Sequence, residues 1–454
     1  VFGYFGLFDL GLGRTTTRAI ADALGRGDTA RLPATFWTTV HLQTGLGLLA
    51  AVLSHLAAPL IAGRVLNIPG GFERETVLTL RLVGWSLPVM FVASSFRGAL
   101  EAAQRFDLVN AVKVPTNVLF YLLPLAGTLL GYELPGIVGL LVLSRFAALA
   151  AWAALALRVL PELRTRPAAR RELVRPLFAF SGWLGLSSVL YAVTSSMDRL
   201  VIGSLITVAA VAFYSAPYEA INRIGVVPGS LSMVLFPAFS YLDAGGRRRE
   251  VEALFARSVK FLLLSTGPVF VVLIFFARPL LRLWLGADFA AESAFAVRVL
   301  AAGFLVNTVI AVPNNYLIGI GRVDVAPKYQ AVELVVFTAA TWAGAKLAGI
   351  DGVAAVAAVR LAAFSVFLLA VSFTAGGVPF GYVWKNGFAG VVSALALLAA
   401  GLAVSTALGG GFWGAGALLA AFAAAAWSRV LTADERAFLL GLLKRPRPRQ
   451  EAAA

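Results

Sequence analysis

The stretch YSAPYEAINRIGVVPG, residues 214–229, places charged side chains inside an apolar run that extends from about 205 to 242. Glu219 and Arg223 are four residues apart, so on a helix they would share one face, with Asn222 beside them. A charge at mid-membrane costs about 2.5–3.5 kcal/mol, so such residues usually face a bundle interior or a wet cavity. Pro217 and Gly225 interrupt the same run, and broken helices at membrane depth line cavities. These residues are candidates for binding a charged substrate or a coupling ion; the alternative is a structural ion pair.

Other apolar runs carry similar polar side chains, and we expect them to face the same chamber. The further candidates are Asp198 and Arg199, Arg97 and Glu101, Arg145 and Arg360, and Asn314 and Asn315. Each has a simpler reading. Arg97 and Arg199 could reach toward the water at a helix end, while Arg145 and Arg360 could brace helices. The asparagines could satisfy backbone groups freed by Pro313. Together the residues predict a polar chamber with an excess of positive charge.

The elements that must position these residues are membrane-spanning helices. Of 454 residues, 59% are hydrophobic and only 13% are charged, whereas soluble domains are about a quarter charged. A spanning helix needs roughly 20 mostly apolar residues. About thirteen such runs are present, at 1–12, 34–62, 77–104, 108–131, 135–160, 177–206, 207–242, 259–277, 293–320, 331–348, 352–372, 387–408 and 412–430. The fold class is therefore an all-α polytopic membrane protein.

Basic residues predict which way the helices point. The net charge is +15, and Lys and Arg fall mainly in alternate connections, as they do in cytoplasmic loops of membrane proteins. This pattern places the C-terminus in the cytoplasm. The first run is short and ends in the cytoplasm, so we expect one helix upstream and fourteen in the intact chain. The basic tail, 432–454, is expected to meet anionic membrane lipid.

Two pairs of similar segments indicate an internal repeat. GALEAAQRFDLVNAVKV at 98–114 compares with YLIGIGRVDVAPKYQAV at 316–332, and LPGIVGLLVLSRF at 134–146 compares with LAGIDGVAAVAAVR at 347–360. An even number of helices separates the copies, so the repeat is parallel, an architecture in which transporters bind substrate between two halves. The expected organisation is two six-helix lobes related by a pseudo-two-fold axis. The divisions are a first lobe at 1–160 without its first helix, a basic linker at 161–175, a second lobe at 176–376 and an accessory helix pair at 377–431.

Several functional classes lack their residues. Cysteine is absent and only two histidines are present, so thiol chemistry is excluded, and no metal site or cofactor is expected. The positive charge is explained by topology, so a nucleic-acid partner is not expected. The phosphate-loop pattern GxxxxGK[ST] does not occur, which argues against an ATP-driven pump. A membrane glycosyltransferase or polymerase would usually need a sizeable extramembrane domain or paired metal-binding carboxylates. We therefore expect a transporter and not an enzyme.

The segment GLFDLGLGRTTTRAIADALGRGD at 6–28 resembles the second helix of bacterial polysaccharide flippases of the O-antigen type. These belong to the multidrug/oligosaccharidyl-lipid/polysaccharide (MOP) exporter superfamily. SSMDRLVIGSLITVAAVAFYSAPYEAINRI at 195–224 and SMVLFPAFSYL at 232–242 resemble later helices of the same family. The resemblance covers nearly the whole chain.

The resemblance implies alternating access between two lobes around a cationic cavity, in the bacterial cytoplasmic membrane. The implied substrate is a polyprenyl-pyrophosphate-linked glycan, moved from the cytoplasmic to the outer leaflet, with glycan polymerase or export machinery as a further partner. Arg side chains suit a pyrophosphate, and the coupling ion would be H⁺ or Na⁺, if not the membrane potential itself. The alternative is a cation-coupled multidrug exporter of the same superfamily, for which acidic residues should dominate the chamber.

Overall fold

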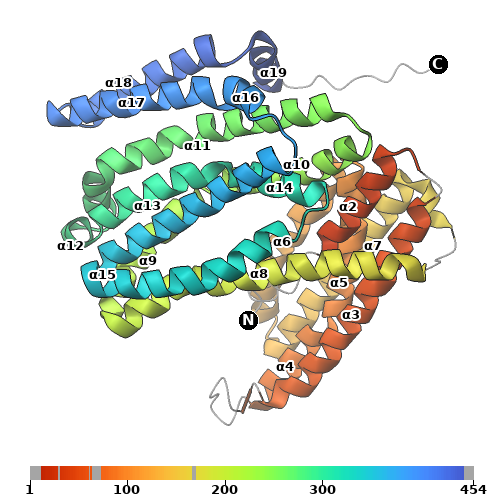
Figure 1. Cartoon of the computed structure of the whole chain (residues 1–454). Coiled ribbons are helices and arrows are strands. Elements are labelled where there is room, and N and C mark those ends of the chain that lie inside the picture. Colours follow the sequence, from red (N-terminus) through yellow and green to blue (C-terminus); the bar gives the residue numbers. More distant parts are fainter. Residues whose placement is uncertain (1–11, 29–30, 61, 64–72, 166–169, 444–454) are drawn as a thin grey trace. The chain divides into compact units, whose positions relative to one another are not determined.

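The computed structural model describes residues 12–28, 31–60, 62–63, 73–165 and 170–443. In these residues the chain forms helices joined by turns and short connections, with no strand (Figure 1). The all-α fold expected from composition is therefore confirmed. Of the first predicted run, 1–12, all but Leu12 lies outside the described residues. Leu12 begins the helix α2, Leu12–Gly25.

Eleven described helical segments are long and apolar enough to cross a membrane. Most of them match the later predicted runs closely, but α11 (Arg248–Trp284) extends beyond the run predicted at 259–277. The runs at 331–348 and 352–372 are confirmed as two helices, which join within α15 (Val325–Thr374) at a kink where Ala348 and Gly349 leave the helical conformation. The run at 207–242 divides into α9 (Val208–Arg223) and α10 (Val226–Ala244), so the predicted interruption is present.

The chain packs into two compact units. Unit 1 contains the described residues up to Val193, together with Ser232–Val251 and Asn315–Val332. Its core includes the edge-to-face rings of Phe36, Trp37 and Phe96. Its elements are α2, α3 (Leu32–Leu60), α4 (Glu73–Trp85), α5 (Leu87–Ala102), α6 (Phe106–Leu129), α7 (Leu134–Val159), η3 (Pro161–Arg164), the first part of α8 (Arg171–Leu205), most of α10, the end of α14 (Ala311–Gly319) and the start of α15.

Unit 2 contains Thr194–Leu231, Glu252–Asn314 and the described residues from Glu333 onward. Its core is built around Tyr214, Phe270 and Phe304. Its elements are the end of α8, α9, α11 (Arg248–Trp284), α12 (Ala287–Glu292), α13 (Ala294–Asn307), η4 (Thr308–Ile310), most of α15, α16 (Phe380–Val383), η5 (Trp384–Phe388), α17 (Ala389–Ala407), α18 (Gly411–Ala425), η6 (Ala426–Val430) and α19 (Ala433–Leu443).

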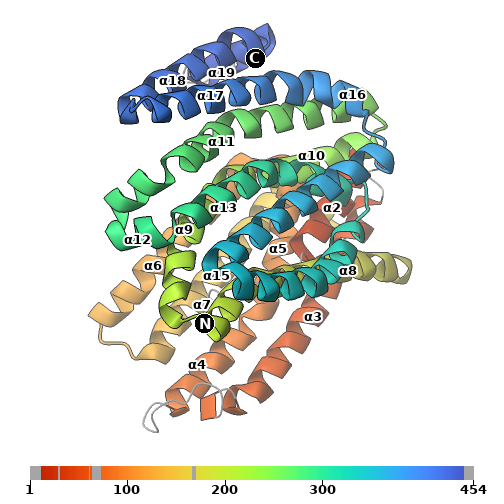
Figure 2. The ribbon, with the colours of Figure 1, turned by 60° about the vertical axis from the view of Figure 1, so that its left-hand side comes forward.

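The units do not follow the predicted lobe boundaries, because parts of α8, α10 and α14 from the predicted second lobe pack with α2 in unit 1. The lobes at 1–160 and 176–376 describe transport halves and stay a prediction. The predicted accessory pair corresponds to α17 and α18, which lie side by side in both ribbon views (Figures 1 and 2). The predicted tail begins with the helix α19.

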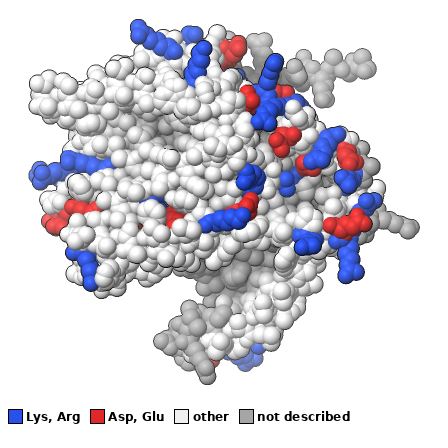
Figure 3. Space-filling view, in the orientation of Figure 1, with Lys and Arg blue, Asp and Glu red and all other residues white. Residues whose placement is uncertain are grey.

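The surface suits a hydrocarbon environment. Large apolar side chains stand exposed along the helices, including Leu129 and Trp413, which are 80% and 93% exposed. Much of the face in Figure 3 carries neither Lys or Arg nor Asp or Glu. Soluble monomers rarely expose contiguous apolar patches of this kind, whereas a membrane protein buries them in lipid. The helices therefore belong to a multi-pass membrane protein.

Candidate functional site

A buried ionic cluster lies in unit 2, where α8, α9 and α15 supply its side chains. Arg360 Nη1 lies 3.5 Å from Glu333 Oε1, and the same guanidinium attracts the carboxylate of Asp198. The Tyr214 hydroxyl donates a hydrogen bond of 2.9 Å to Asp198 Oδ2. All four side chains are more than nine-tenths buried. In this cluster, two carboxylates share one guanidinium.

The charge balance of this cluster defines what it can bind. A buried ion costs several kcal/mol to desolvate, so each buried charge needs a partner of opposite sign. Asp198 and Glu333 share Arg360, and Arg199 also attracts Asp198. With two carboxylates around one buried guanidinium, the cluster does not supply the positive excess that the sequence predicts for the chamber.

The bend in α15 brings Glu333 and Arg360 together. On either side of the kink at Ala348 and Gly349, the two helices approach so closely that a Cβ on Gly352 would collide with the Gly344 carbonyl oxygen. Only glycine allows such contact between backbones. On the other side of the cluster, Thr207 caps α9 by accepting a hydrogen bond of 3.0 Å from Ala210 N. Such a cap fixes the point where a helix begins.

A second ion pair involves the residue next to Asp198 in the chain. Arg199 forms a salt bridge with Glu219, and its guanidinium carbon lies 5.9 Å from the centre of the Tyr218 ring. The side chains of Arg199 and Glu219 are 37% and 45% exposed. This pair is open to a substrate or to lipid head groups, whereas the Asp198 cluster is not.

The partner expected for Glu219 was Arg223, and here the structure differs. Glu219 pairs with Arg199 of α8, twenty residues earlier, and not with the residue four positions later. Arg223 ends α9, and both Arg223 and Asn222 are exposed. The helical spacing predicts that Glu219 and Arg223 can meet, but a neighbouring helix offers Glu219 a closer cation.

Arg97 and Glu101, which were expected to share one helix face, form an ion pair within α5, and their place in a substrate chamber stays a prediction. Arg97 Nε lies 3.3 Å from Glu101 Oε1, and Thr17 of α2 donates a hydrogen bond of 3.3 Å to Glu101 Oε2. Gly98 lets α2 approach, because a Cβ there would lie 2.8 Å from Gly13 O. The pair therefore ties α5 to α2 in unit 1.

The remaining candidates have separate surroundings. Arg145 of α7 donates a hydrogen bond of 2.6 Å to Ser86 Oγ. Asn315 is 2% exposed and Asn314 is partly exposed. Arg97, Glu101, Arg145 and Asn315 belong to unit 1, and the other predicted site residues belong to unit 2. A single chamber that joins all of them stays a prediction.

Sequence reasoning missed a buried polar network in unit 1. Gln43 of α3 is 1% exposed and accepts hydrogen bonds from the hydroxyls of Ser94 and Ser95 of α5. Its amide nitrogen donates to Thr16 Oγ1 of α2 at 3.3 Å. The signal was available, because Gln43 is a lone amide inside the apolar run at 34–62. Glu333, also missed, stands near the start of the apolar run at 331–348.

A second missed feature is the seam along α2, formed by Thr15, Arg18 and Gly25 against α8, α10 and α14. The hydroxyls of Thr15 and Ser181 lie 2.7 Å apart. Arg18 Nε donates a hydrogen bond of 3.2 Å to Gly319 O, and its guanidinium lies 4.9 Å from the Phe180 ring centre. These contacts join segments about 166 and 301 residues apart in sequence.

The seam continues toward the end of α2 and into α10. Ser240 donates a hydrogen bond of 3.4 Å to Arg18 O. A Cβ on Gly25 would collide with Tyr241 O, so glycine is required for this approach. Gly321, with φ +90, turns the chain after α14 close to the Arg18 guanidinium. The seam is made of hydrogen bonds from hydroxyls, close approaches at glycines and the contacts of one cation. Such contacts are small enough to break and form again when helices move.

Among the described residues, no group of three or more His, Cys, Asp or Glu side chains is placed to hold a metal ion. The ionisable clusters are instead the pairings given above. Ionisable residues within membrane spans are candidates for substrate and ion pathways.

Comparisons with known proteins give the class and the family. The family model for polysaccharide biosynthesis proteins matches residues 26–294. A Shigella flexneri protein named "Putative O-antigen transporter" is 23% identical over 348 residues, which cover 74% of this chain and 79% of that protein. The Vibrio cholerae MATE transporter VcmN in its bent form superposes with a TM-score of 0.72 at 18% identity, over 82% of this chain and 86% of that one. A MOP superfamily transporter from Pyrococcus furiosus gives a TM-score of 0.70 at 15% identity, over 83% and 87%.

The membrane-spanning helices and their arrangement define a multi-pass membrane protein with the MATE-type fold. Within that class, the family model covers more than half of this chain. The chain belongs to the polysaccharide biosynthesis protein family, the polysaccharide flippases of the MOP superfamily. The resemblance drawn from the segments at 6–28, 195–224 and 232–242 is confirmed.

Proposed function

We propose that this transporter moves a polyprenyl-pyrophosphate-linked oligosaccharide across the bacterial cytoplasmic membrane by alternating access. The substrate enters from the cytoplasmic leaflet and leaves in the outer one. The C-terminus lies in the cytoplasm, as the basic loops predict. Membership of the polysaccharide family supports the glycan, and the long apolar helices are suited to a substrate with a lipid anchor.

The observation that carries the mechanism is the seam along α2. This helix lies in the predicted first lobe, and its partners in α8, α10 and α14 lie in the predicted second lobe. In the predicted topology, the ends of α2, α8, α10 and α14 that form the seam lie on the cytoplasmic side of the membrane. A seam that joins both lobes on one side of the membrane supports a state closed to the cytoplasm. Opening it would admit the substrate.

The charged residues divide between substrate binding and coupling. Arg199 and Arg223 are accessible enough to bind a pyrophosphate, whose oxygens suit the fork of N–H donors on a guanidinium. Asn222, which is exposed beside Arg223, can donate to sugar hydroxyls. The buried Asp198–Arg360–Glu333 cluster holds two carboxylates around one guanidinium, and we assign it to the coupling cation, H⁺ or Na⁺.

A deletion strain tests the proposal directly. Cells that lack the gene for this chain should accumulate lipid-linked repeat units on the inner leaflet and lose surface glycan. A plasmid copy of the gene should restore both, and an Asp198→Asn copy should restore export weakly if the cluster couples transport. Normal surface glycan without accumulation in the deletion strain would exclude the flippase.

A second candidate function is a cation-coupled multidrug exporter. It is favoured by one observation: carboxylates outnumber the guanidinium in the buried cluster of unit 2. An exporter of this kind should change drug susceptibility. If the deletion strain becomes sensitive to cationic drugs while its surface glycan stays intact, the exporter is the better description.

A further inference from the structure

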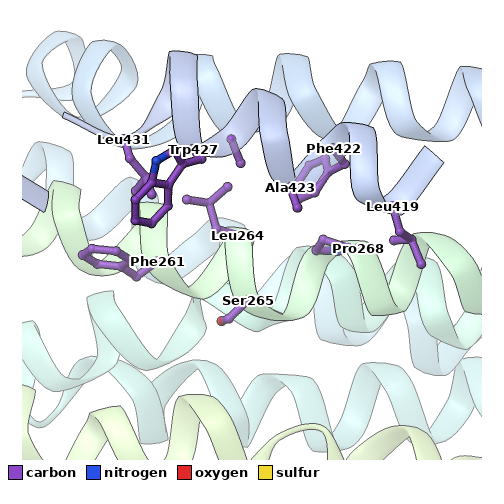
Figure 4. A pocket seen from close by; sticks show the side chains of 10 residues that line it. Phe261, Leu264, Ser265, Pro268, Leu419, Phe422, Ala423, Trp427 and Leu431 are labelled. Atoms are coloured by element: carbon purple, nitrogen blue, oxygen red, sulfur yellow. The ribbon is translucent and has the colours of Figure 1, made fainter. Parts of the chain in front are cut away.

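An apolar groove of about 390 Å³ lies between α11 and the helices α18 and η6 in unit 2 (Figure 4). From α11 it is lined by Phe261, Leu264 and Pro268. Facing them are apolar side chains of α18 and η6, among them Phe422 and Trp427. Both walls belong to helical segments apolar enough to span a membrane, so the groove lies where hydrocarbon chains lie.

The helix α17 explains why the groove exists. Gly267 of α11 packs against Leu395 of α17, where a Cβ would lie 2.8 Å from the leucine. Gly401 of α17 packs equally closely against Leu418 of α18. Glycine brings α17 close to both neighbours, and the space between α11 and α18 is left to larger side chains that do not fill it. Ser265, the hydroxyl in the lining, donates to Leu262 O and leaves the wall apolar.

One end of the groove is cationic. Figure 4 places Phe261, Trp427 and Leu431 together at that end. Arg257 is one turn before Phe261 on α11, and Arg429 stands exposed two residues before Leu431. Just beyond, in α19, Arg436 has a buried Nε with no hydrogen-bond partner among the described residues.

The acidic residue at this end is already engaged. Glu435 accepts hydrogen bonds of 3.0 Å from Lys260 to both carboxylate oxygens, and Arg257 Nε lies 3.7 Å from Oε1. Glu435 balances Lys260, and the exposed Asp434 is its acidic neighbour in α19, so Arg257, Arg429 and Arg436 leave an excess of positive charge at this end. We call Arg257, Arg429 and Arg436 the basic collar of the groove.

We propose that this groove binds one acyl chain of an anionic glycerophospholipid, with its phosphate at the basic collar. The apolar wall suits the chain, and the charge of the collar suits the head group. The wall from Phe261 to Pro268 is about 10 Å long, since a helix rises 1.5 Å per residue, which matches part of an acyl chain better than a long polyprenyl tail. The lipid would fill the gap between α11 and α18 and fasten the accessory pair to the bundle.

Trp427 provides the probe, because it lines the groove and its fluorescence is quenched by a bromine atom nearby. The full chain is placed in nanodiscs that contain phosphatidylglycerol or phosphatidylcholine with brominated acyl chains. The signal of Trp427 is obtained by subtracting the Trp427→Phe variant. Phosphatidylglycerol should quench at a lower mole fraction than phosphatidylcholine, by roughly fivefold for each engaged basic residue.

Two alanines give a matched pair of variants. Ala423→Leu fills the groove and should remove the preference for phosphatidylglycerol, whereas Ala424→Leu, one residue further and outside the lining, should retain it. Arg429→Gln should weaken the preference about fivefold. Equal quenching by the two lipids, or unchanged quenching in Ala423→Leu, would overturn the proposal. So would displacement of the brominated lipid by an equimolar polyprenyl phosphate, which would assign the groove to a polyprenyl chain.

Discussion

Glu333 and Arg360 stand on the two helices that join at the Ala348–Gly349 kink of α15, and they form an ion pair whose side chains are only 4% and 8% exposed. Removing one partner of a buried pair leaves an uncompensated charge, which costs about 3–5 kcal/mol. Arg360→Met removes the guanidinium that neutralises Glu333 and Asp198, so it should lower the free energy of unfolding by that amount. Glu333→Gln leaves Arg360 paired with Asp198 and should cost about 1 kcal/mol.

Thermal unfolding of the purified variants in detergent tests whether Arg360→Met loses more stability than Glu333→Gln. The double variant Arg360→Met with Glu333→Gln should be less destabilised than the sum of the single changes, because one stranded carboxylate has been removed. If Arg360→Met unfolds at the wild-type temperature, the pair does not stabilise the fold.

Arg223 is expected to act on substrate and not on stability. It is exposed at the end of α9, so Arg223→Ala should change the free energy of unfolding by no more than about 0.5 kcal/mol. If it binds the pyrophosphate, the variant loses surface glycan while its protein level stays normal. Immunoblots and glycan gels of the complemented deletion strain measure both. Wild-type glycan in this variant would remove Arg223 from the binding site.

The seam along α2 should open and close during transport. The chain has no cysteine, so Thr15→Cys and Ser181→Cys can be introduced without background. Their hydroxyl oxygens lie 2.7 Å apart, within reach of a disulfide. Oxidation should cross-link the double variant and stop transport, and reductant should restore it. Oxidation and reduction should not change transport by the two single variants. Transport that continues through the cross-linked protein would show that the seam is static.

The docking of α19 should depend on pH. Burial raises the pKa of Glu435, but hydrogen bonds from the Thr432 backbone and from Lys260 outweigh it and hold the pKa below the ordinary value of 4.5. A depressed carboxyl pKa contributes stability that is present above 4.5 and is lost as the pH falls through the folded value. Limited proteolysis after α18 should therefore accelerate only in acid. Glu435→Gln should be cleaved faster near neutral pH and should show no acid step.

Hydrophobic run length predicted the fold well, because the need for about 20 apolar residues leaves little freedom in a bilayer. The runs at 34–62 and 108–131 correspond to α3 and α6 within two residues at each end. The reversal within α15 was predicted as the short connection between the runs at 331–348 and 352–372, and the structure confirms it. Run length does not show that only Ala348 and Gly349 leave the helical conformation at this reversal.

The charged residues of the candidate site could be named from the sequence, but the partner of each residue could not. Spacing within a helix allows Arg97 to meet Glu101, as the structure shows, and would allow Glu219 to meet Arg223, but Glu219 pairs with Arg199 of α8 instead. Contacts between helices depend on how each helix is rotated about its axis, and no single sequence specifies that rotation. Asp198 and Arg360 were both named, yet Glu333, which also pairs with Arg360, was not.

The bend at Ala348 and Gly349 also bears on how the chain enters a membrane during synthesis. A lone charge at the centre of a spanning helix costs about 2.5–3.5 kcal/mol to insert. Glu333 precedes the bend and Arg360 follows it, so the opposite charges meet as soon as both arms have left the ribosome. Residues 325–374 are therefore expected to insert as a helical hairpin whose charges neutralise each other before they leave water.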